Sequence, residues 1–283
     1  MNEFEAHRGR MLGIAYRLLG SFVDAEDVVQ ETWIAWDTVD RGAVADPGAY
    51  LARAVTHRAL NRVRTLARQR EDYIGSWLPE PVATERLPDE AAEIADSLSF
   101  AMLVLMEQLS PLERAAFILR EVFALDTAET AEILGRTPVA VRKLLSRARA
   151  RLDDAPPAPE DTVAGHVRTS TAFVTAIQTG DIATALSLLS PSVELVTDGG
   201  GKASAARRPV TGADAVLRFL VGALDKWGAD SITPISVNHR TALLIESAAS
   251  GPSLYQIDVR DGRIQHIWAT RNPDKLTSAT SPS

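Results

Sequence analysis

The sequence predicts a multidomain chain in which two all-α helical domains are followed by one α+β domain. Two stretches have apolar residues at helical spacing, and a third mixes a helical stretch with several short runs typical of strands. Segments rich in proline separate these parts. The expected boundaries are 1–72 for the first helical domain, 73–95 for an acidic proline-rich linker, 96–153 for the second helical domain, 154–162 for a second linker, 163–276 for the α+β domain and 277–283 for a polar tail.

The composition is that of a folded, water-soluble chain. Of the 283 residues, 46% are apolar and 24% are charged, which is normal for globular domains. No apolar run approaches the roughly 18 residues that a membrane helix needs, and the N-terminal segment lacks the apolar core of a signal peptide. The chain has no cysteine, which excludes disulfides, thiol catalysis and cysteine-based metal sites. We therefore expect a cytoplasmic protein with no membrane contact, metal or cofactor.

The net charge of −7 conceals a local sorting of charge. Residues 71–98 carry one basic and eight acidic side chains, so this stretch alone equals the whole imbalance. Each helical domain has an acidic half followed by a basic half: residues 47–70 hold six arginines and no acid, and residues 134–152 hold five arginines, one lysine and no acid. The basic halves predict contact with nucleic acid, and the acidic halves remain available to a basic protein partner.

Local signals place the helices of the first domain. Gly20 predicts the end of one helix, and Asp46 followed by Pro47 predicts the start of another. The apolar side of that later helix holds Leu51, Val55, Ala59 and Val63. The opposite side holds Arg53, His57, Asn61, Arg64 and Arg68, with Arg62 beside them. A solvated arginine-rich face is the plain alternative, but such a face usually mixes charge signs, and this one favours nucleic-acid contact.

The second helical domain has two start signals and one turn signal. Ser110 with Glu113, and Asp126 with Glu129, have the spacing of capping boxes. Gly135 fits the turn of a helix-turn-helix. On the second helix of that motif, the residues expected to face inward are Val141, Leu145, Ala148 and Leu152. Those expected to face outward are Arg142, Lys143, Ser146, Arg147, Arg149 and Arg151.

The remaining segments are less regular. Residues 73–95 read as an extended acidic tether, although Tyr73 and Trp77 are unusual in a tether and suggest that it docks. In the last domain, residues 163–178 look helical, and four runs look like strands: SVELVT, TALLIE, LYQIDV and RIQHIWA. The run DGGGK predicts a turn.

These motifs together resemble one family. The first domain, with LLGSFVDAEDVVQETWIAW and AYLARAVTHRALNRVR, resembles the sigma-two domain of bacterial extracytoplasmic-function sigma factors. The second, with LSPLERAAFILREVFALDTAETAEILGRTPVAVRKLLSRARARL, resembles their sigma-four domain. The segments DYIGSWLPEPV, DGGGKASAARRPVTG and NPDKL resemble the SigJ-type subfamily, whose members carry a C-terminal SnoaL-like cone domain. The chain departs from the family in ALDTAETA, where Thr130 stands at a position that is usually apolar.

The resemblance implies a promoter-specificity subunit that binds core RNA polymerase and promoter DNA. It implies polymerase contacts for Asp24, Asp27, Gln30, Glu31 and Trp33. It implies recognition of the minus-ten element by the helix of Arg53, His57, Asn61, Arg62, Arg64 and Arg68. It implies recognition of the minus-thirty-five element by Arg142, Lys143, Ser146, Arg147 and Arg149.

The resemblance also implies control by the chain's own C-terminal extension. We expect the WLPEP segment to pack against the SnoaL-like domain beside NPDKL, with Trp77 as the large apolar anchor. The expected regulatory contact involves Trp77, Leu78, Pro79, Asp198, Asn272, Pro273 and Asp274. Ending the chain before Asn272 is then expected to remove only this contact.

Two other functions remain open for the C-terminal domain. SnoaL-like folds include isomerases and hydro-lyases, and the candidate acid–base residues are Asp198, His239 and His266. No second carboxylate or base stands at a defined spacing from them, and a shared fold does not by itself carry function. A small-molecule sensor fused to a DNA-binding module is the other alternative. We expect a sigma factor with no catalytic residue.

Overall fold

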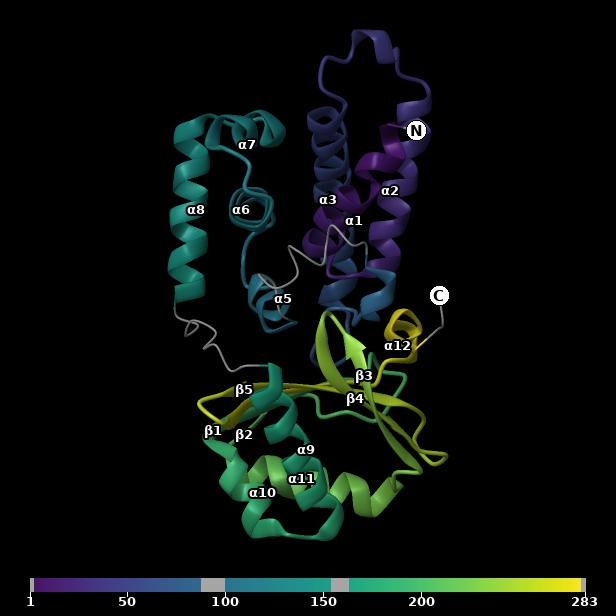
Figure 1. Cartoon of the computed structure of the whole chain (residues 1–283), viewed down its shortest axis with the longest axis vertical. Coiled ribbons are helices and arrows are strands. Elements are labelled where there is room, and N and C mark those ends of the chain that lie inside the picture. Colours follow the sequence, from purple (N-terminus) through teal and green to yellow (C-terminus); the bar gives the residue numbers. More distant parts are fainter. Residues whose placement is uncertain (1–2, 88–99, 154–162, 281–283) are drawn as a thin grey trace. The chain divides into compact units, whose positions relative to one another are not determined.

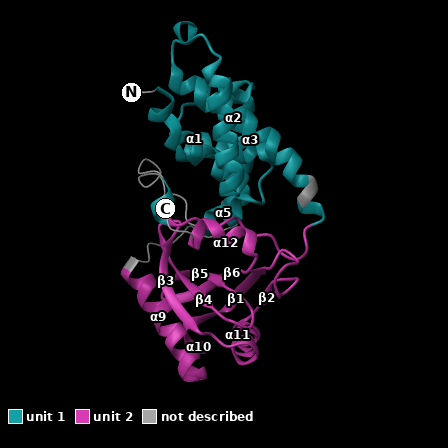
Figure 2. Ribbon diagram, turned by 90° about the vertical axis from the view of Figure 1, so that its right-hand side faces the viewer, with its two compact units in different colours: residues 1–72, 84–156, 283 teal, residues 73–83, 157–282 magenta. Residues whose placement is uncertain are grey.

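The structure is a computed structural model that describes residues 3–87, 100–153 and 163–280. It divides into two compact units (Figure 2): unit 1 comprises Met1–Asp72 and Thr84–Pro156, and unit 2 comprises Tyr73–Ala83 and Pro157–Pro282. The fold class expected from the sequence is confirmed, because unit 1 is helical and unit 2 combines helices with a sheet (Figure 1). The division differs from the expected domains, since both helical domains share unit 1 and the start of the expected linker belongs to unit 2.

Three helices form the first half of unit 1. They are α1 (Glu3–Leu19), α2 (Phe22–Asp37) and α3 (Pro47–Glu71), with a short 3-10 turn, η1 (Arg41–Ala43), before α3. Gly20 lies between α1 and α2 with a φ of 66°, a left-handed conformation that glycine adopts without strain. The carboxylate of Asp46 accepts a hydrogen bond from the backbone N–H of Ala49 at 3.0 Å, and Pro47 occupies the first turn of α3, as expected.

The second half of unit 1 contains the helix-turn-helix. Its elements are η2 (Thr84–Arg86), α5 (Phe100–Met106), α6 (Pro111–Phe117), the π-helical turn η3 (Ile118–Val122), α7 (Thr127–Leu134) and α8 (Pro138–Asp153). Both expected capping boxes are present, at the starts of α6 and α7. Gly135 ends α7 with a φ of 61°, and α8 begins three residues later. No sequence signal predicted the π-helical turn.

The two halves of unit 1 pack on each other. Helix α1 packs on α2 and α3, and α6 and α7 pack on α8. Helix α3 also contacts α6 and α7, which joins the halves into one unit. The expected apolar side of α3 is buried at Leu51, Val55 and Ala59, while Val63 is half-buried. No helix within the three described ranges has the length and hydropathy of a membrane-spanning segment.

Unit 2 is built on a six-stranded sheet. The strands are β1 (Leu189–Asp198), β2 (Val210–Thr211), β3 (Ser231–Val237), β4 (Arg240–Glu246), β5 (Ser253–Arg260) and β6 (Arg263–Thr270). Their order is β2-β1-β6-β5-β4-β3; β1 and β6 are parallel, and the other neighbours are antiparallel. The four strand-like runs of the sequence coincide with β1, β4, β5 and β6.

Four helices within the described residues complete unit 2. They are α9 (Val163–Thr179), α10 (Ile182–Leu188), α11 (Ala213–Trp227) and α12 (Pro273–Thr280). The first three gather on one face of the sheet, and α12 lies on the other (Figure 1). Leu276 and Ala279 of α12 pack in a small core with Val237, Ala242 and Leu254. The polar tail expected from residue 277 is therefore helical up to Thr280, because its inner side contributes to this core.

Candidate functional site

Helix α3 carries the basic stripe that the sequence predicts. The exposed side chains of the stripe are those of Arg53, His57, Asn61 and Arg64. Arg62 is half-buried, and the side chain of Arg68 lies outside the described residues. Nη1 of Arg64 donates a hydrogen bond to Oδ1 of Asn61 at 3.0 Å. Such a row of polar and cationic groups on one side of a helix can reach phosphates and base edges of a nucleic acid.

The N-terminal part of this stripe contacts helix α7. Nη1 of Arg53 lies 3.3 Å from Oε1 of Glu132. Nε2 of His57 lies 2.6 Å from the carbonyl oxygen of Ile133, so that nitrogen carries the proton and donates. In this conformation of unit 1, two side chains expected to bind DNA are engaged by the first helix of the helix-turn-helix.

The guanidinium of Arg62 faces the acidic side of α2. Its nitrogens lie 3.4 Å from Asp24, 3.2 Å from Asp27 and 3.9 Å from Glu31. The structure thus brings together one residue expected to contact DNA and three expected to contact the polymerase. Acidic side chains of α2 therefore pair with a basic side chain of α3 within the same domain. The distribution of charge along the sequence did not predict this pairing.

The outer side of α2 presents a second surface. Val23, Trp33 and Ile34 are exposed by 50%, 44% and 56%. A surface hollow here is lined by Phe4, Glu5, Arg8, Val23, Glu26, Asp27, Val29, Gln30 and Trp33. Of the residues expected to contact the polymerase, Asp27, Gln30 and Trp33 line this hollow. Exposed aromatic side chains such as tryptophan are enriched at protein-binding surfaces.

Helix α8 has the expected inside and outside. The buried side chains are Val141, Leu145, Ala148 and Leu152, together with Leu144. The exposed ones are Arg142, Lys143, Ser146, Arg147, Arg149 and Arg151. Arg142, Ser146 and Arg149 line one shallow hollow on this exposed side. The structure therefore brings these three candidate DNA-binding residues together on one surface.

Glu113 anchors the C-terminal half of α8, and sequence reasoning assigned it only a capping role. Its carboxylate lies 2.6 Å from Nη1 of Arg151 and 3.3 Å from Nε of Arg147, and its side chain is only 3% exposed. Burial alone would raise the pKa of Glu113, but the hydrogen bonds from Ser110 and the charges of Arg151 and Arg147 hold it below its ordinary value. Arg149 pairs separately with Glu121 at 2.6 Å.

Thr130 stands on α7 at the position where the family usually has an apolar residue, and it is fully buried. Its hydroxyl donates to the backbone carbonyl of Asp126 at 2.8 Å, so its polar group is satisfied within the helix. The departure from the family pattern therefore leaves α7 packed without an orphaned hydroxyl.

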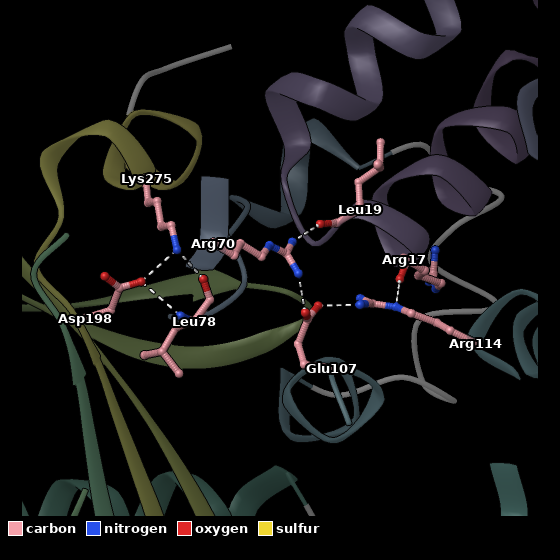
Figure 3. A network of polar contacts seen from close by, with 8 residues as sticks. All are labelled: Arg17, Leu19, Arg70, Leu78, Glu107, Arg114, Asp198 and Lys275. Carbon is pink, nitrogen blue, oxygen red and sulfur yellow. Dashed lines mark hydrogen bonds and ion pairs between the residues drawn. The ribbon is translucent and has the colours of Figure 1, made fainter. Parts of the chain in front are cut away.

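Glu107, directly after α5, pairs with one arginine of α3 and one of α6 (Figure 3). Its carboxylate accepts from Arg70 at 2.5 Å and also pairs with Arg114. Arg70 donates in addition to the carbonyl of Leu19 at 2.6 Å, and Arg114 donates to the carbonyl of Arg17 at 2.7 Å. The burial of Arg70 lowers its pKa, while the charge of Glu107 raises it in part. This network was not predicted, because its members are far apart in sequence.

In unit 2, the segment Tyr73–Ala83 lies against the rest of the unit; we call it the docked segment. Asp198, at the end of β1, is fully buried and accepts three hydrogen bonds. The donors are the hydroxyl of Tyr73 at 2.5 Å, the backbone N–H of Leu78 at 2.9 Å and Nζ of Lys275 at 2.7 Å. Lys275 also donates to the carbonyl of Leu78 at 2.5 Å (Figure 3).

Asn272 and the start of α12 complete this end of the contact. Nδ2 of Asn272 donates to the hydroxyl of Tyr73 at 2.9 Å, and its backbone N–H donates to the carbonyl of Asp198 at 2.9 Å. Burial and the hydrogen bond to Asp198 raise the pKa of Tyr73. Pro273 begins α12, and the exposed Asp274 pairs with Lys202 at 2.5 Å.

The far end of the docked segment extends the sheet. Ala83 forms a β-bridge with Val237, and its N–H donates to the carbonyl of Ser278 at 3.0 Å. The N–H of Val82 donates to Oδ1 of Asn238 at 3.2 Å. The buried carboxylate of Glu80 accepts from the hydroxyl of Ser278. Polar contacts along the segment thus fix which of its residues lie opposite Val237, Asn238 and Ser278.

The apolar anchor of the docked segment is Leu78 and not Trp77. Leu78 is 1% exposed and Pro79 is buried, whereas Trp77 is half-buried. The ammonium of Lys275 lies 4.1 Å from the centroid of the Trp77 ring. Trp77 therefore makes a cation–π contact with Lys275 from a half-buried position. The prediction of a buried tryptophan anchor was wrong in this respect.

The three candidate acid–base residues do not converge. Asp198 is occupied by the docked segment, and Nδ1 of His266 lies 3.2 Å from Asp258, with its ring stacked on Trp268. His239 lies in the turn between β3 and β4. A cavity of unit 2 lies elsewhere, between α9, α11 and the sheet, and its lining, all of it within the described part of the chain, contains no Asp, Glu or His.

Comparison with known proteins matches both helical segments to sigma factors. The Sigma-70 region 2 model matches residues 4–69, and the Sigma-70, region 4 model matches residues 99–152. The extracytoplasmic-function (ECF) RNA polymerase sigma factor SigJ of Mycobacterium tuberculosis is 38% identical over 99% of this chain and 94% of its own length. The probable ECF RNA polymerase sigma factor SigI of the same species is 28% identical over 67% of each chain.

The match extends to three dimensions. The crystal structure of Mycobacterium tuberculosis extracytoplasmic function sigma factor SigJ superposes with a TM-score of 0.79 at 37% identity, and the match covers 98% of each chain. The similarity therefore includes unit 2 as well as the two helical segments.

Proposed function

This chain belongs to the extracytoplasmic-function sigma factors, which direct transcription initiation by RNA polymerase, and we propose that unit 2 regulates that activity in cis. The proposal rests on the hydrogen bonds that Asp198 and Lys275, themselves an ion pair, make to the backbone of the docked segment at Leu78. Asp72 and Thr84, on either side of that segment, both belong to unit 1. Docking therefore constrains the path of the chain from α3 to the rest of unit 1.

The contacts inside unit 1 support a free form that binds DNA weakly. Arg53 and His57 of α3 are engaged by α7, and Arg62 is engaged by the acids of α2. A promoter would have to displace these partners before it could use the same side chains. Binding of core polymerase to α2, through Asp27, Gln30 and Trp33, would open the two halves and release α3 for the minus-ten element.

The recognition helix supports a division of labour on the minus-thirty-five element. Arg142, Lys143 and Ser146 lie toward the N-terminal end of α8, the end that enters the major groove in helix-turn-helix proteins. Arg147, Arg149 and Arg151 are each paired with an acid of α6 or η3. We assign base readout to Arg142 and Arg147, which lie nearer that end than Arg149 and Arg151, and phosphate contact to Arg149 and Arg151.

Two variants test the cis regulation. Lys275→Met removes the ammonium that links Asp198 to Leu78, and Lys202→Met removes an exposed lysine of the same unit as the matched control. Removing one partner of a buried ion pair costs about 3–5 kcal/mol, and a change of that size shifts a two-state population by more than about a hundredfold. We expect promoter-dependent run-off transcription with purified core polymerase to rise by at least about fivefold for Lys275→Met only. Equal output from the parent and both variants, all shown to be folded, would refute the regulatory role.

A truncation is the poorer test. Ending the chain before Asn272 would also remove Leu276 and Ala279 from a core, so it cannot remove the docking contact alone. The expectation that this truncation is selective was wrong for that reason. Point variants at Lys275 leave the apolar side of α12 in place.

A further inference from the structure

Unit 2 contains a cavity that the sigma-factor activity does not use. It lies between α9, α11 and the sheet, and its lining is largely apolar, with Phe173, Ile177, Leu224, Trp227 and Ile257 among the residues. About 100 Å³ of it is open to the centres of water-sized molecules. Since one water needs about 10–15 Å³ on this measure, the cavity has room for a ligand of about ten non-hydrogen atoms.

One cation lines this apolar cavity. Arg271, directly after β6, is 8% exposed. Nη1 donates to the carbonyl of Ser204, Nη2 lies 3.4 Å from the carbonyl of Ser250, and the guanidinium lies 5.1 Å from the centroid of the Trp227 ring. Its Nε is buried and has no hydrogen-bond partner among the residues that the structure describes. No carboxylate within the described ranges lies within 4.0 Å of it.

A buried guanidinium is always charged and is costly to keep without a counter-ion. Backbone carbonyls and an aromatic face offset part of that cost but supply no negative charge. The remaining donor, Nε, together with one Nη group, forms the fork that a carboxylate fits bidentately. The surroundings thus satisfy Arg271 incompletely, and the missing partner is an anion.

We propose that this cavity binds a small apolar carboxylate, with the hydrocarbon or aromatic body among the apolar side chains and the carboxylate on Arg271. The absence of Asp and Glu from the lining disfavours cationic ligands. The apolar walls disfavour a polyphosphate, which would bring several charges into one cavity with a single cation. Tyr255 also lines the cavity; burial raises its pKa, so its hydroxyl stays protonated and can donate to the ligand.

The site has a direct structural link to the docked segment. The backbone N–H of Arg271 donates to the carbonyl of Asp198 at 2.7 Å, and the next residue, Asn272, donates to the same carbonyl. The side chain of Asp198 holds Tyr73 and Leu78. A carboxylate that repositions Arg271 therefore acts on the residue that holds the docked segment. Any effect of the ligand on transcription rests on the cis regulation proposed above, whereas binding itself does not.

The test uses a matched pair of probes with the full-length protein. Phenylacetate and its neutral amide, phenylacetamide, have the same apolar body and differ in charge. We expect calorimetric titration to show the carboxylate binding about tenfold more tightly than the amide, because a charge-assisted bidentate pair is lost in the amide. Arg271→Met should abolish this preference, and Arg263→Met, which removes an arginine outside the cavity lining, should retain it.

A second variant covers the outcome in which Arg271→Met fails to fold. Ala223→Phe fills the cavity from α11 and leaves Arg271 in place, so it should weaken both probes together. Equal affinity of the parent protein for acid and amide would overturn the proposal, as would binding of neither probe. Loss of the preference in Arg263→Met would also overturn it, because the effect would then reflect net charge and not the cavity.

Discussion

Nζ of Lys275 lies 2.7 Å from Oδ2 of Asp198, and both side chains bind the backbone of the same residue, Leu78, one at its carbonyl and the other at its N–H. An ion pair with exposed fractions of 12% and 0% thus holds both backbone polar groups of a residue that precedes Asp198 by 120 positions. The arrangement saturates both charges with partners, which is the condition under which a buried pair is tolerated.

Removing one member of this pair should destabilise unit 2. Asp198→Asn leaves Lys275 without its counter-ion, and we expect the free energy of unfolding to fall by about 3–5 kcal/mol. Asp274→Asn is the matched control, because its pair with Lys202 is exposed and worth at most about 1 kcal/mol. Chemical denaturation of both variants measures the difference. Similar losses in the two would contradict the special role of Asp198.

DNA binding by the free protein should be weak and should improve when α7 releases α3. Glu132→Gln removes the acidic partner of Arg53. Because exposed pairs are worth about 0.2–1 kcal/mol, affinity for a minus-ten fragment should rise by no more than about fivefold. Asp37→Asn changes the net charge equally in an exposed pair away from the stripe and serves as control. An equal rise in both variants would assign the effect to net charge. Tight, sequence-specific binding by the unaltered free protein at physiological salt would refute the masking.

The two ends of α8 should respond differently to truncation. Arg142→Ala should relax specificity at one position of the minus-thirty-five element, at a cost of about 1–3 kcal/mol. Arg151→Ala should weaken all promoter variants alike and flatten the salt dependence, because it removes a phosphate contact. Holoenzyme binding to a set of single-base promoter variants separates the two. If Arg142→Ala weakens every variant equally, the assignment of base readout to that arginine fails.

Unit 2 should lose stability in acid through Asp258. Burial would raise the pKa of this carboxyl, but the hydrogen bond from His266 and the charges of Arg260 and His266 hold it below its ordinary value. A depressed pKa contributes stability that is complete above the unfolded-state value of about 3.9 and is lost as the pH falls through the folded-state value. Urea unfolding of the parent and of Asp258→Asn should therefore differ while the carboxyl is ionised and converge once acid protonates it in the folded protein. A difference that persists undiminished at the acid end of the titration would contradict this.

Much of unit 1 could be predicted from local sequence. A cap acts within one turn, so Ser110 with Glu113 and Asp126 with Glu129 specify helix starts without any distant partner. Gly135 similarly determines the turn of the helix-turn-helix, because few other residues adopt its backbone conformation. Helical periodicity is also a local property of the sequence, and it correctly placed the basic residues of α3 and α8 on the sides away from the apolar residues.

The partners of those residues were decided only by the tertiary structure. Periodicity shows which side of α3 Arg53 and His57 occupy, but Glu132 and Ile133 reach them across 79 and 76 residues of chain. The anchor of the docked segment depended on tertiary packing too, since Leu78 is buried whereas Trp77 lies against the ammonium of Lys275. In the sequence, Arg271 is an arginine like any other after a strand; only the folded sheet and helices bury it with no carboxylate of the described residues beside it. A sequence records which groups can pair, but burial and long-range closure decide which of them do.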